Sequence, residues 1–243
     1  MATPVAAAKK QLRSMIKTRL SNLSQDAVNA QSRTIFETLQ NLRQYKEARR
    51  ISIYLSMPAA EVQTDAIVRH ALACGKQVFV PYLHKSTLST SDTPARVMDM
   101  VHLKDIQDYE SLARDRWGIP SIDDAAVVGR DRILGGDAAV FGDDPATLDL
   151  MLVPGVAFDV DEEGAVRRLG HGKGFYDFFL NRYYARAAEH GGKGSSLELL
   201  GLALSEQWLN AAAGEEVPMG MYDRKLHGLI LGDGQEKKSP HAD

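Results

Sequence analysis

The chain has 243 residues, of which 44% are hydrophobic, and a formal net charge of −3. This length suits one α/β domain with a core of ordinary size. The near-neutral charge gives no basic footprint for nucleic acid, and no apolar run approaches the roughly 18 residues of a membrane span. A single cysteine, Cys74, excludes an intrachain disulfide. We expect a cytoplasmic protein; the basic N-terminus makes a mitochondrial location thinkable but less favoured.

The first forty residues predict two helices. In residues 4–22, apolar side chains recur at helical spacing, from Leu12 to Leu20. Ser24 is a good N-cap for a second helix that ends near Arg43. The other faces of the first helix carry basic side chains, a pattern that is typical of a solvated surface: Lys9, Lys10, Arg13, Lys17 and Arg19.

Strands and helices then alternate. Residues 50–55 are rich in β-branched side chains and predict a strand, residues 65–73 predict a helix behind Thr64, and residues 77–80 predict a strand that Pro81 ends. This alternation indicates a parallel sheet with right-handed crossovers.

The middle of the chain offers weaker signals. Glu61 is the one charged residue in a loop that follows the first strand, at the edge where ligands of open α/β sheets bind. Residues 97–103 predict a strand whose methionines line either the core or a flat apolar ligand. Trp117 either stacks on an aromatic ring or covers the core. Residues 121–147, rich in aspartate and glycine, look like a partly disordered insertion without assigned function.

The most informative stretch runs from Leu148 to Leu180. A buried strand at residues 150–153 is stopped by Pro-Gly, and a basic, glycine-punctuated loop at residues 167–174 then opens into a helix that starts near Gly174. Glycines at alternate positions let backbone N–H groups approach an anion closely. The positive end of the following helix points at the same place.

Charged side chains strengthen the case for phosphate binding at this loop. Arg167, Arg168 and Lys173 supply positive charge, and His171 supplies a donor. Asp177, one turn into the helix, can hold a divalent cation on the phosphates. The spacing fits neither a Walker A loop nor the dinucleotide fingerprint, and a plain tight turn is the alternative.

The C-terminal region completes the predicted sheet. Residues 197–204 and 228–231 predict two more strands, with a glycine-rich surface loop at 189–196 before them. We therefore expect a three-layer, Rossmann-like α/β sandwich with a mostly parallel central sheet and helices on both faces. It would form one domain over residues 1–231, followed by a flexible tail over residues 232–243.

Several motifs in matching order resemble the 5-formyltetrahydrofolate cyclo-ligase family, also called methenyltetrahydrofolate synthetase. They are AKKQLR, LSMPAAEVQT, MDMVHL, WGIP, LDLMLVPGVAFD and, most specifically, RLGHGKGFYD. The resemblance covers roughly residues 8–230. It implies an ATP- and Mg²⁺-dependent cyclisation of 5-formyltetrahydrofolate to 5,10-methenyltetrahydrofolate. ADP and phosphate would leave by way of an iminium phosphate, in which the formyl oxygen is phosphorylated.

The resemblance also implies roles for individual residues. Phosphate and nucleotide contacts fall on Lys9, Lys10, Arg13, Arg168, Leu169, Gly170, His171, Gly172, Lys173, Gly174, Phe175 and Tyr176. Folate contacts fall on Leu55, Met57, Glu61, His171, Gly172, Lys173, Gly174 and Phe175, with Glu61 holding the pterin-like ring. Lys173, Arg168 and Tyr176 would be the catalytic group, and Asp177 and Asp223 would share one Mg²⁺.

Two other functions remain open at this stage. One is a sugar-phosphate isomerase or CoA-transferase-like enzyme of similar topology, which needs a carboxylate base and no ATP. The other is a non-catalytic folate-binding protein. The sequence shows no convincing Ser-His-Asp or Cys-His constellation. The expected partners are ATP and 5-formyltetrahydrofolate, with no nucleic acid or membrane, and the expected state is a monomer. His171 stands where the family often has arginine, which leaves its contact with substrate open.

Overall fold

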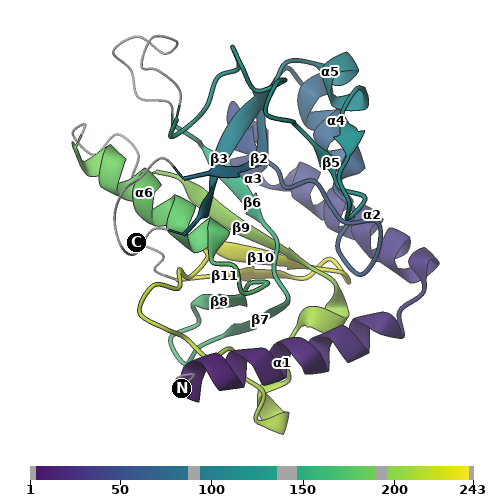
Figure 1. The fold of residues 1–243 in the computed structure, drawn as a ribbon. Coiled ribbons are helices and arrows are strands. Elements are labelled where there is room, and N and C mark those ends of the chain that lie inside the picture. The colour runs from purple at the N-terminus through teal and green to yellow at the C-terminus, as the bar shows by residue number, and fades with distance from the viewer. Residues whose placement is uncertain (1–3, 87–93, 136–146, 190–195, 241–243) are drawn as a thin grey trace.

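A seven-stranded sheet forms the centre of the molecule (Figure 1). The computed structural model describes residues 4–86, 94–135, 147–189 and 196–240. The strand order is β11-β10-β9-β6-β1-β2-β3, and only the edge strands β3 and β11 run antiparallel to their neighbours. The strands of this sheet are β1 (Arg50–Ser52), β2 (Gln77–Lys85), β3 (Arg96–Leu103), β6 (Leu150–Val153), β9 (Glu198–Ala203), β10 (Gly228–Leu231) and β11 (Glu236–Lys238).

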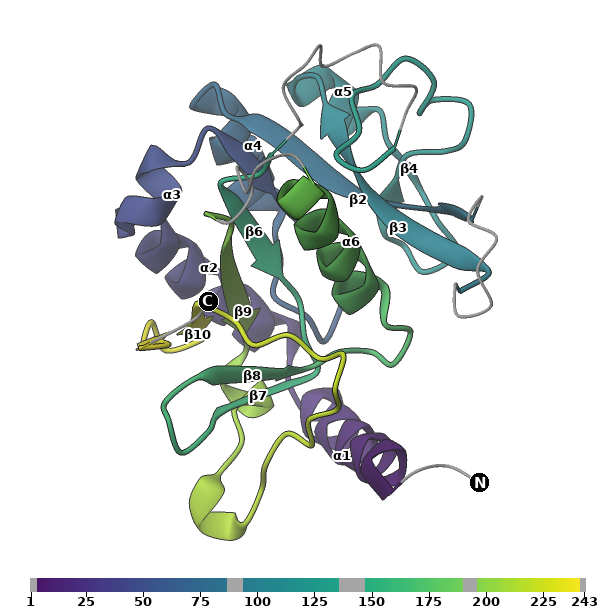
Figure 2. The ribbon, with the colours of Figure 1, turned by 90° about the vertical axis from the view of Figure 1, so that its left-hand side faces the viewer.

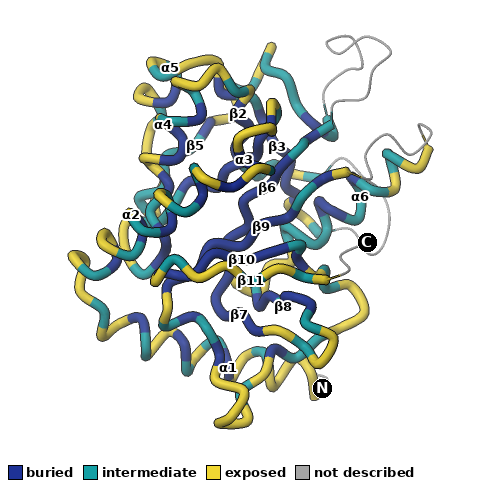
Figure 3. Tube along the Cα trace, turned by 180° about the vertical axis from the view of Figure 1, so that it is seen from behind, coloured by how far each residue is buried: buried dark blue, intermediate teal, exposed yellow. Residues whose placement is uncertain are grey.

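Helices cover both faces of the sheet, so the three-layer α/β sandwich is confirmed. Helix α6 packs on one face, and α2 and α4 pack on the other (Figure 2). The inner strands β1, β6, β9 and β10 are buried almost throughout, whereas the edge strand β11 is largely exposed (Figure 3). The helices are α1 (Pro4–Ser21), α2 (Gln25–Asn41), α3 (Arg43–Glu47), α4 (Asp65–Ala73), α5 (Ile106–Glu110) and α6 (Phe175–Glu189), with short 3₁₀ turns at Ser205–Gln207 and Ala211–Ala213. None of the described helices is long and apolar enough to cross a membrane.

The direction of winding reverses between β1 and β6. The chain passes from β1 through α4 to β2 on one side, and from β6 through α6 to β9 on the other. Ligands of open α/β sheets bind outside the carboxyl ends of the strands at such a reversal. Helix α1 crosses this end of the sheet, below the tip of the β6 arrow in Figure 2.

A β-hairpin follows β6 and leads into the glycine-rich loop. Strands β7 (Ala157–Val160) and β8 (Val166–Leu169) pair antiparallel outside the main sheet. The sequence predicted a loop from Arg167 onward, which is wrong for Arg167–Leu169. Alternation in VRRL is too short to show as a strand, and the pairing with β7 decides it.

Two further strand predictions need correction. The first strand ends at Ser52 rather than Leu55, and β2 continues through Pro81 to Lys85. Proline fits inside β2 because the parallel pairing with β1 stops at Phe79. The carbonyl of Phe79 faces β1, and backbone groups two residues apart on a strand face the same side, so the nitrogen of Pro81 also faces the β1 side. Beyond Phe79, β2 pairs only with β3 among the described strands, and the missing N–H of Pro81 therefore interrupts no hydrogen bond between strands. Met98 and Met100 of β3 are fully buried, as the core interpretation predicted.

The polar segments are more ordered than their composition indicated. In the tail, Glu236–Lys238 pairs with β10, and Ser239 Oγ donates to the carbonyl of Leu226, so a loose tail is wrong for these residues. In the predicted insertion, Ile133 is buried and Arg130 Nη2 donates to Asp108 Oδ1 at 2.6 Å. Two-residue strands β4 (Ala113–Arg114) and β5 (Pro120–Ser121) precede it. Residues 136–146 of the insertion, and most of the loop 189–196, lie outside the described residues.

Candidate functional site

Four segments meet at the carboxyl ends of β1 and β6. They are the loop after β1 (residues 53–64), the glycine loop (residues 170–174), the aspartate loop (residues 217–224) and helix α1. Contacts join α1 to both the glycine loop and the aspartate loop, the loop after β1 to the glycine loop, and the aspartate loop to α6. The sequence placed candidate residues on all four of these segments.

The shape of the glycine loop depends on its glycines. Gly172 and Gly174 have φ values of +93° and +68°, a region that side-chain-bearing residues rarely adopt. Arg13 Nε of α1 donates to the carbonyl of Gly170 at 2.8 Å. A Cβ atom on Gly172 would stand 3.1 Å from Cζ of Arg13, so a side chain there would press on the guanidinium of Arg13. The Phe178 N–H donates to the carbonyl of Gly174 at 2.9 Å, which places the start of α6 at the loop.

The cations around the loop differ in how they are engaged. Lys173 is exposed and makes no ion pair or hydrogen bond within the part of the chain that the structure describes. Lys9 pairs with Asp223. Arg168 is buried, and its Nη2 donates to both carboxylate oxygens of Asp177 at 3.1 and 3.0 Å. Its Nη1 donates to the carbonyl of Pro154, at the end of β6, at 3.2 Å.

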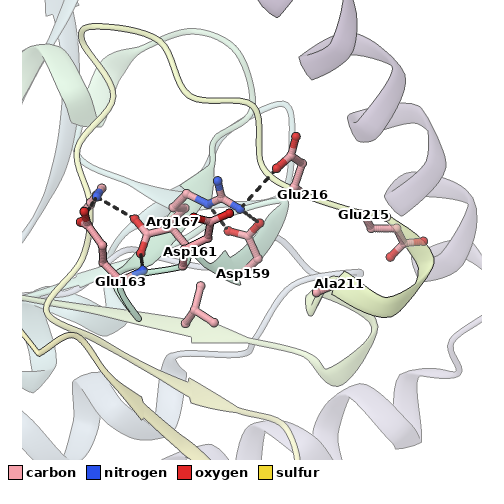
Figure 4. A pocket seen from close by; sticks show the side chains of 11 residues that line it. Asp159, Asp161, Glu163, Arg167, Ala211, Glu215 and Glu216 are labelled. Atoms are coloured by element: carbon pink, nitrogen blue, oxygen red, sulfur yellow. Dashed lines mark hydrogen bonds and ion pairs between the residues drawn. The ribbon is translucent and has the colours of Figure 1, made fainter.

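Arg167 does not belong to this group. Its Nε donates to Asp159 Oδ1 at 2.8 Å, and its guanidinium points toward Asp159 and Glu216 (Figure 4). There it lines a separate cavity of about 670 Å³ on the β7–β8 hairpin. Residues alternate sides along a strand, so neighbouring arginines of β8 face opposite ways. The expectation that Arg167 supplies positive charge for phosphate binding at the glycine loop is wrong.

The two predicted metal ligands lie near each other. The N–H of Arg224, the residue after Asp223, donates to Asp177 Oδ1 at 3.3 Å. Both carboxylates are partly exposed, 19% for Asp177 and 20% for Asp223, and each has one cationic partner. Two accessible carboxylates near the glycine loop fit the chemistry of Mg²⁺, which favours carboxylate oxygens, phosphate oxygens and water as ligands. The described residues contain no cluster of three or more His, Cys, Asp or Glu residues that could hold a metal ion. A metal ion at Asp177 and Asp223 would therefore also need phosphate oxygens and water as ligands.

Glu61 is a buried carboxyl group next to the glycine loop. Its Oε2 accepts the N–H of Met57 at 2.8 Å, and its Oε1 lies 3.9 Å from Nε2 of His171. Burial raises the pKa of Glu61 to about 7, although the Met57 N–H opposes the shift. The pKa of His171 is lowered, first by desolvation and then by Arg168 and Arg13, even though about half of its side chain is exposed.

Two tyrosines complete the surroundings of Glu61. The pKa values of Tyr54 and Tyr176 are raised, mainly by burial and then by the nearby Glu61. The ring centroid of Tyr176 lies 5.6 Å from the guanidinium carbon of Arg168. Leu55 is buried at the same loop. The structure therefore brings together a carboxyl acceptor, aromatic rings and the glycine loop.

Some predicted residues stand apart from this arrangement. Lys10 is exposed on α1 without a hydrogen bond or ion pair among the described residues, and the side chain of Leu169 is buried in the core. Phe175 is half-buried against the face of the sheet that α6 covers. Trp117 is 62% exposed, so it does not cover the core.

Sequence reasoning missed three participants. Tyr54 lies inside an apolar strand pattern that gave no functional signal. Asn181 and Arg224 link α6 to the aspartate loop, with Arg224 Nη2 donating to Asn181 Oδ1 at 2.6 Å. The sequence did offer one signal for them: Asn181 lies one helical turn after Asp177, and Arg224 directly follows Asp223.

Comparison with known proteins places this geometry in context. The model of the 5-formyltetrahydrofolate cyclo-ligase family matches residues 5–231. A Schizosaccharomyces pombe protein named probable 5-formyltetrahydrofolate cyclo-ligase is 30% identical over 91% of this chain and 94% of its own length. A Caenorhabditis elegans protein with the same name is 32% identical over 91% of both.

The family resemblance extends to mammals and to a solved fold. The Mus musculus 5-formyltetrahydrofolate cyclo-ligase is 34% identical over 74% of this chain and 77% of its own length. The solved structure of Aquifex aeolicus 5,10-methenyltetrahydrofolate synthetase superposes with a TM-score of 0.63. It covers 97% of this chain and 94% of its own at 22% identity, which supports a common fold.

The raised pKa of Glu61 makes the stability of the free protein depend on pH. Between the ordinary value of 4.5 and about 7, the folded state holds a proton that the unfolded state has lost. The stabilisation is therefore complete below pH 4.5 and is lost as pH rises through 7. Glu61→Gln keeps a neutral acceptor and removes this dependence. We expect the variant to gain about 2.5 kcal/mol relative to wild type between pH 5 and pH 8, measured by urea unfolding. A stability difference that stays constant with pH would contradict a raised pKa.

Proposed function

Because this chain belongs to the 5-formyltetrahydrofolate cyclo-ligase family of enzymes, we propose that it cyclises 5-formyltetrahydrofolate to 5,10-methenyltetrahydrofolate with ATP and Mg²⁺. One observation carries the proposal. The glycine loop, with α1 and the aspartate loop beside it, lies next to the buried carboxyl group of Glu61, which is 3.9 Å from His171. A place for a polyanion thus adjoins a place for a ring with N–H donors.

The triphosphate would lie over the glycine loop. Lys173 has no partner among the described residues, and its ammonium is free to follow the γ-phosphate. Arg13 uses Nε on the carbonyl of Gly170, which leaves its two terminal nitrogens for phosphate oxygens. Loop N–H groups and the N-terminus of α6 add further donors. The nucleotide contacts proposed for Lys10, Leu169 and Phe175 rest on the family resemblance.

Asp177 and Asp223 would hold Mg²⁺, which neutralises phosphate charge when bound. Arg168 would stay with Asp177 and set its orientation, since it is buried and also bonded to Pro154. Lys9, now paired with Asp223, can exchange that partner for a phosphate oxygen when the metal takes the carboxylate.

The folate would be held by Glu61. A carboxylate accepts two parallel N–H donors on the edge of a pterin-like ring, and these donors stabilise its ionised form. Leu55, Met57 and Tyr176 would flank the ring, and His171 would stand between the ring and the phosphates. Glu61 therefore gives up its proton as the substrate binds near neutral pH.

The reaction needs activation of the formyl oxygen, because an amide oxygen is a poor leaving group. That oxygen attacks the γ-phosphorus of ATP, the bond to the β,γ-bridging oxygen breaks, and ADP leaves. The folate N10 then attacks the carbon of the iminium phosphate, loses its proton, and the C–O bond breaks to release phosphate. Lys173 and Arg13 stabilise charge on the transferred group, so catalysis comes from positioning and electrostatics.

One observation favours the isomerase alternative. A carboxyl group with a pKa of about 7 is suited to act as a general base on a carbon acid. Such an enzyme would work without ATP, and a folate-binding protein would show no turnover at all. The proposed extent of one domain over residues 1–231, the monomeric state and the cytoplasmic location complete the proposal.

Formation of the methenyl product tests the function directly. The protein, Mg²⁺-ATP and 5-formyltetrahydrofolate are mixed, and the near-ultraviolet absorption of the product is followed. We expect turnover that stops when ATP or Mg²⁺ is omitted. Lys173→Ala should lower kcat/KM by about 100-fold or more, because it removes charge that develops on the transferred phosphoryl group.

A matched control is Lys17→Ala, another exposed lysine, which lies two turns beyond Lys9 on α1 and should leave the rate unchanged. Turnover without ATP would support the isomerase alternative instead. Binding without turnover would support the folate-binding protein.

Isotope transfer tests the phosphorylated intermediate. The substrate is prepared with ¹⁸O in the formyl group, and the phosphate released by the enzyme is analysed by mass spectrometry. We expect one ¹⁸O atom in each phosphate formed, because the C–O bond breaks after the oxygen has joined phosphorus. Recovery of the label in water would mean that formyl oxygen leaves without phosphorylation.

A further inference from the structure

One face of α6 holds the chain segment that carries Asp223. Asp177, Asn181 and Tyr184 are four and three residues apart, so their side chains share a face of the helix. Arg224 contacts all of them. Its N–H donates to Asp177 Oδ1 at 3.3 Å, and its Nε and Nη2 donate to Asn181 Oδ1 at 2.9 and 2.6 Å. Its guanidinium carbon lies 4.9 Å from the ring centroid of Tyr184.

We propose that Arg224 and Asn181 are positioning residues that fix Asp223 relative to Asp177, and thereby set the carboxylates that meet the metal–triphosphate complex. This inference rests on the proposed function. Neither residue has to touch ATP, metal or folate. They act through the backbone that joins Arg224 to Asp223 and through the helix that joins Asn181 to Asp177.

The other contacts of Asp223 do not reach α6. Its carboxylate pairs with Lys9 of α1 and accepts the N–H of Gly220 within its own loop at 2.5 Å. The two residues before it are strongly exposed, 86% for Met221 and 73% for Tyr222, so packing there does not place the loop. The hydrogen bonds of Arg224 join this loop directly to α6, the helix that carries Asp177.

The chemistry of the contact suits this role. A guanidinium that gives two N–H groups to one oxygen and also lies against an aromatic ring is held in one orientation. Mg²⁺ demands nearly ideal octahedral geometry, so a small displacement of one carboxylate weakens its binding. We call the contacts of Arg224 with Asn181 and Tyr184 the clamp. A loss of the clamp should weaken metal-dependent nucleotide binding and leave folate binding at Glu61 unaffected.

The test measures binding as well as activity. Asn181→Leu and Arg224→Met are titrated calorimetrically with ATP in excess Mg²⁺ and with ATP in a chelator. We expect the Kd for Mg²⁺-ATP to rise about 10-fold or more while the Kd for metal-free ATP changes less than about threefold. In turnover, KM for Mg²⁺-ATP should rise with little change in KM for 5-formyltetrahydrofolate.

Conservative and control variants separate positioning from folding. Asn181→Asp keeps an oxygen acceptor and should restore most of the Mg²⁺-ATP affinity. Arg224→Lys keeps the charge but loses the fork, and should be intermediate. The control is Arg186→Met on the same helix, whose arginine donates to the carbonyl of Ile133 at 2.7 Å, and its nucleotide affinity should match wild type.

Two results would overturn the clamp while the proposed function stands. One is unchanged Mg²⁺-ATP affinity in the folded Asn181 and Arg224 variants of an active enzyme. The other is an equal loss for metal-free ATP, which would show a general disturbance of the loop. If Leu or Met at these positions prevents folding, Arg224→Lys supplies the comparison, because it loses the forked contact with Asn181 and its Kd for Mg²⁺-ATP should still rise above that of wild type. A wild-type protein that neither binds Mg²⁺-ATP nor turns over would instead overturn the proposed function.

Discussion

The candidate site depends on the packing of α1 against the glycine loop. The N-terminal helix lies far from residues 170–174 in sequence, yet Arg13 bonds the carbonyl of Gly170 and occupies the space that a side chain at Gly172 would fill. The left-handed backbone at Gly172 and Gly174 turns the chain from β8 into α6 within this space. This contact joins α1 to the loop from which α6 starts.

The charges of the site are balanced in the free protein by pairs that a ligand can rearrange. Lys9 holds Asp223, and Arg168 holds Asp177. In the proposed complex, the metal would take the carboxylate of Asp223 and a phosphate oxygen would take Lys9, so neither of these charges would be left unpaired. Arg168 differs from Lys9 because it is buried and also bonded to the carbonyl of Pro154. We therefore expect Arg168 to keep its position and its pairing with Asp177 when a ligand binds.

Burial has a different role on the folate side. Glu61 is withdrawn from water, next to Tyr54 and Tyr176, and its proton is released near neutral pH. In the proposed complex, a substrate with two N–H donors would supply the hydrogen bonds that water no longer gives to this carboxylate. The contact between Glu61 and His171 places this demand directly beside the phosphate loop. In the proposed complex, the folate ring, the formyl group and the γ-phosphate would follow one another across the site because of that adjacency.

Local patterns in the sequence predicted much of the fold and part of the site. The limits of β6, β10 and α4 agree with their apolar runs and flanking residues, because burial on both faces or one face leaves a clear pattern. The extension of β2 through Pro81 and the pairing of β8 were not predictable locally, since both depend on which neighbour a strand has. The motif RLGHGKGFYD indicated the glycine loop, but only the fold shows that Arg167 and Arg168 face opposite ways.

Contacts between distant segments were hardest to predict. The pair Lys9–Asp223 and the bonds of Arg224 to Asn181 join positions that no periodicity relates. Ion pairs and arginine hydrogen bonds of this kind are common on protein surfaces. Their relation to the candidate site becomes visible only when the fold brings α1, α6 and the aspartate loop together. Burial of Glu61 was likewise invisible in a loop of small and apolar residues.

A crystal structure with a non-hydrolysable ATP analogue and Mg²⁺ tests the central claim most directly. The account predicts β- and γ-phosphate oxygens at hydrogen-bond distance from the N–H groups of residues 170–174 and from the side chains of Lys173 and Arg13. Mg²⁺ should lie between those phosphates and the carboxylates of Asp177 and Asp223. A nucleotide bound elsewhere, with the glycine loop still closed on Arg13 and free of phosphate, would contradict it.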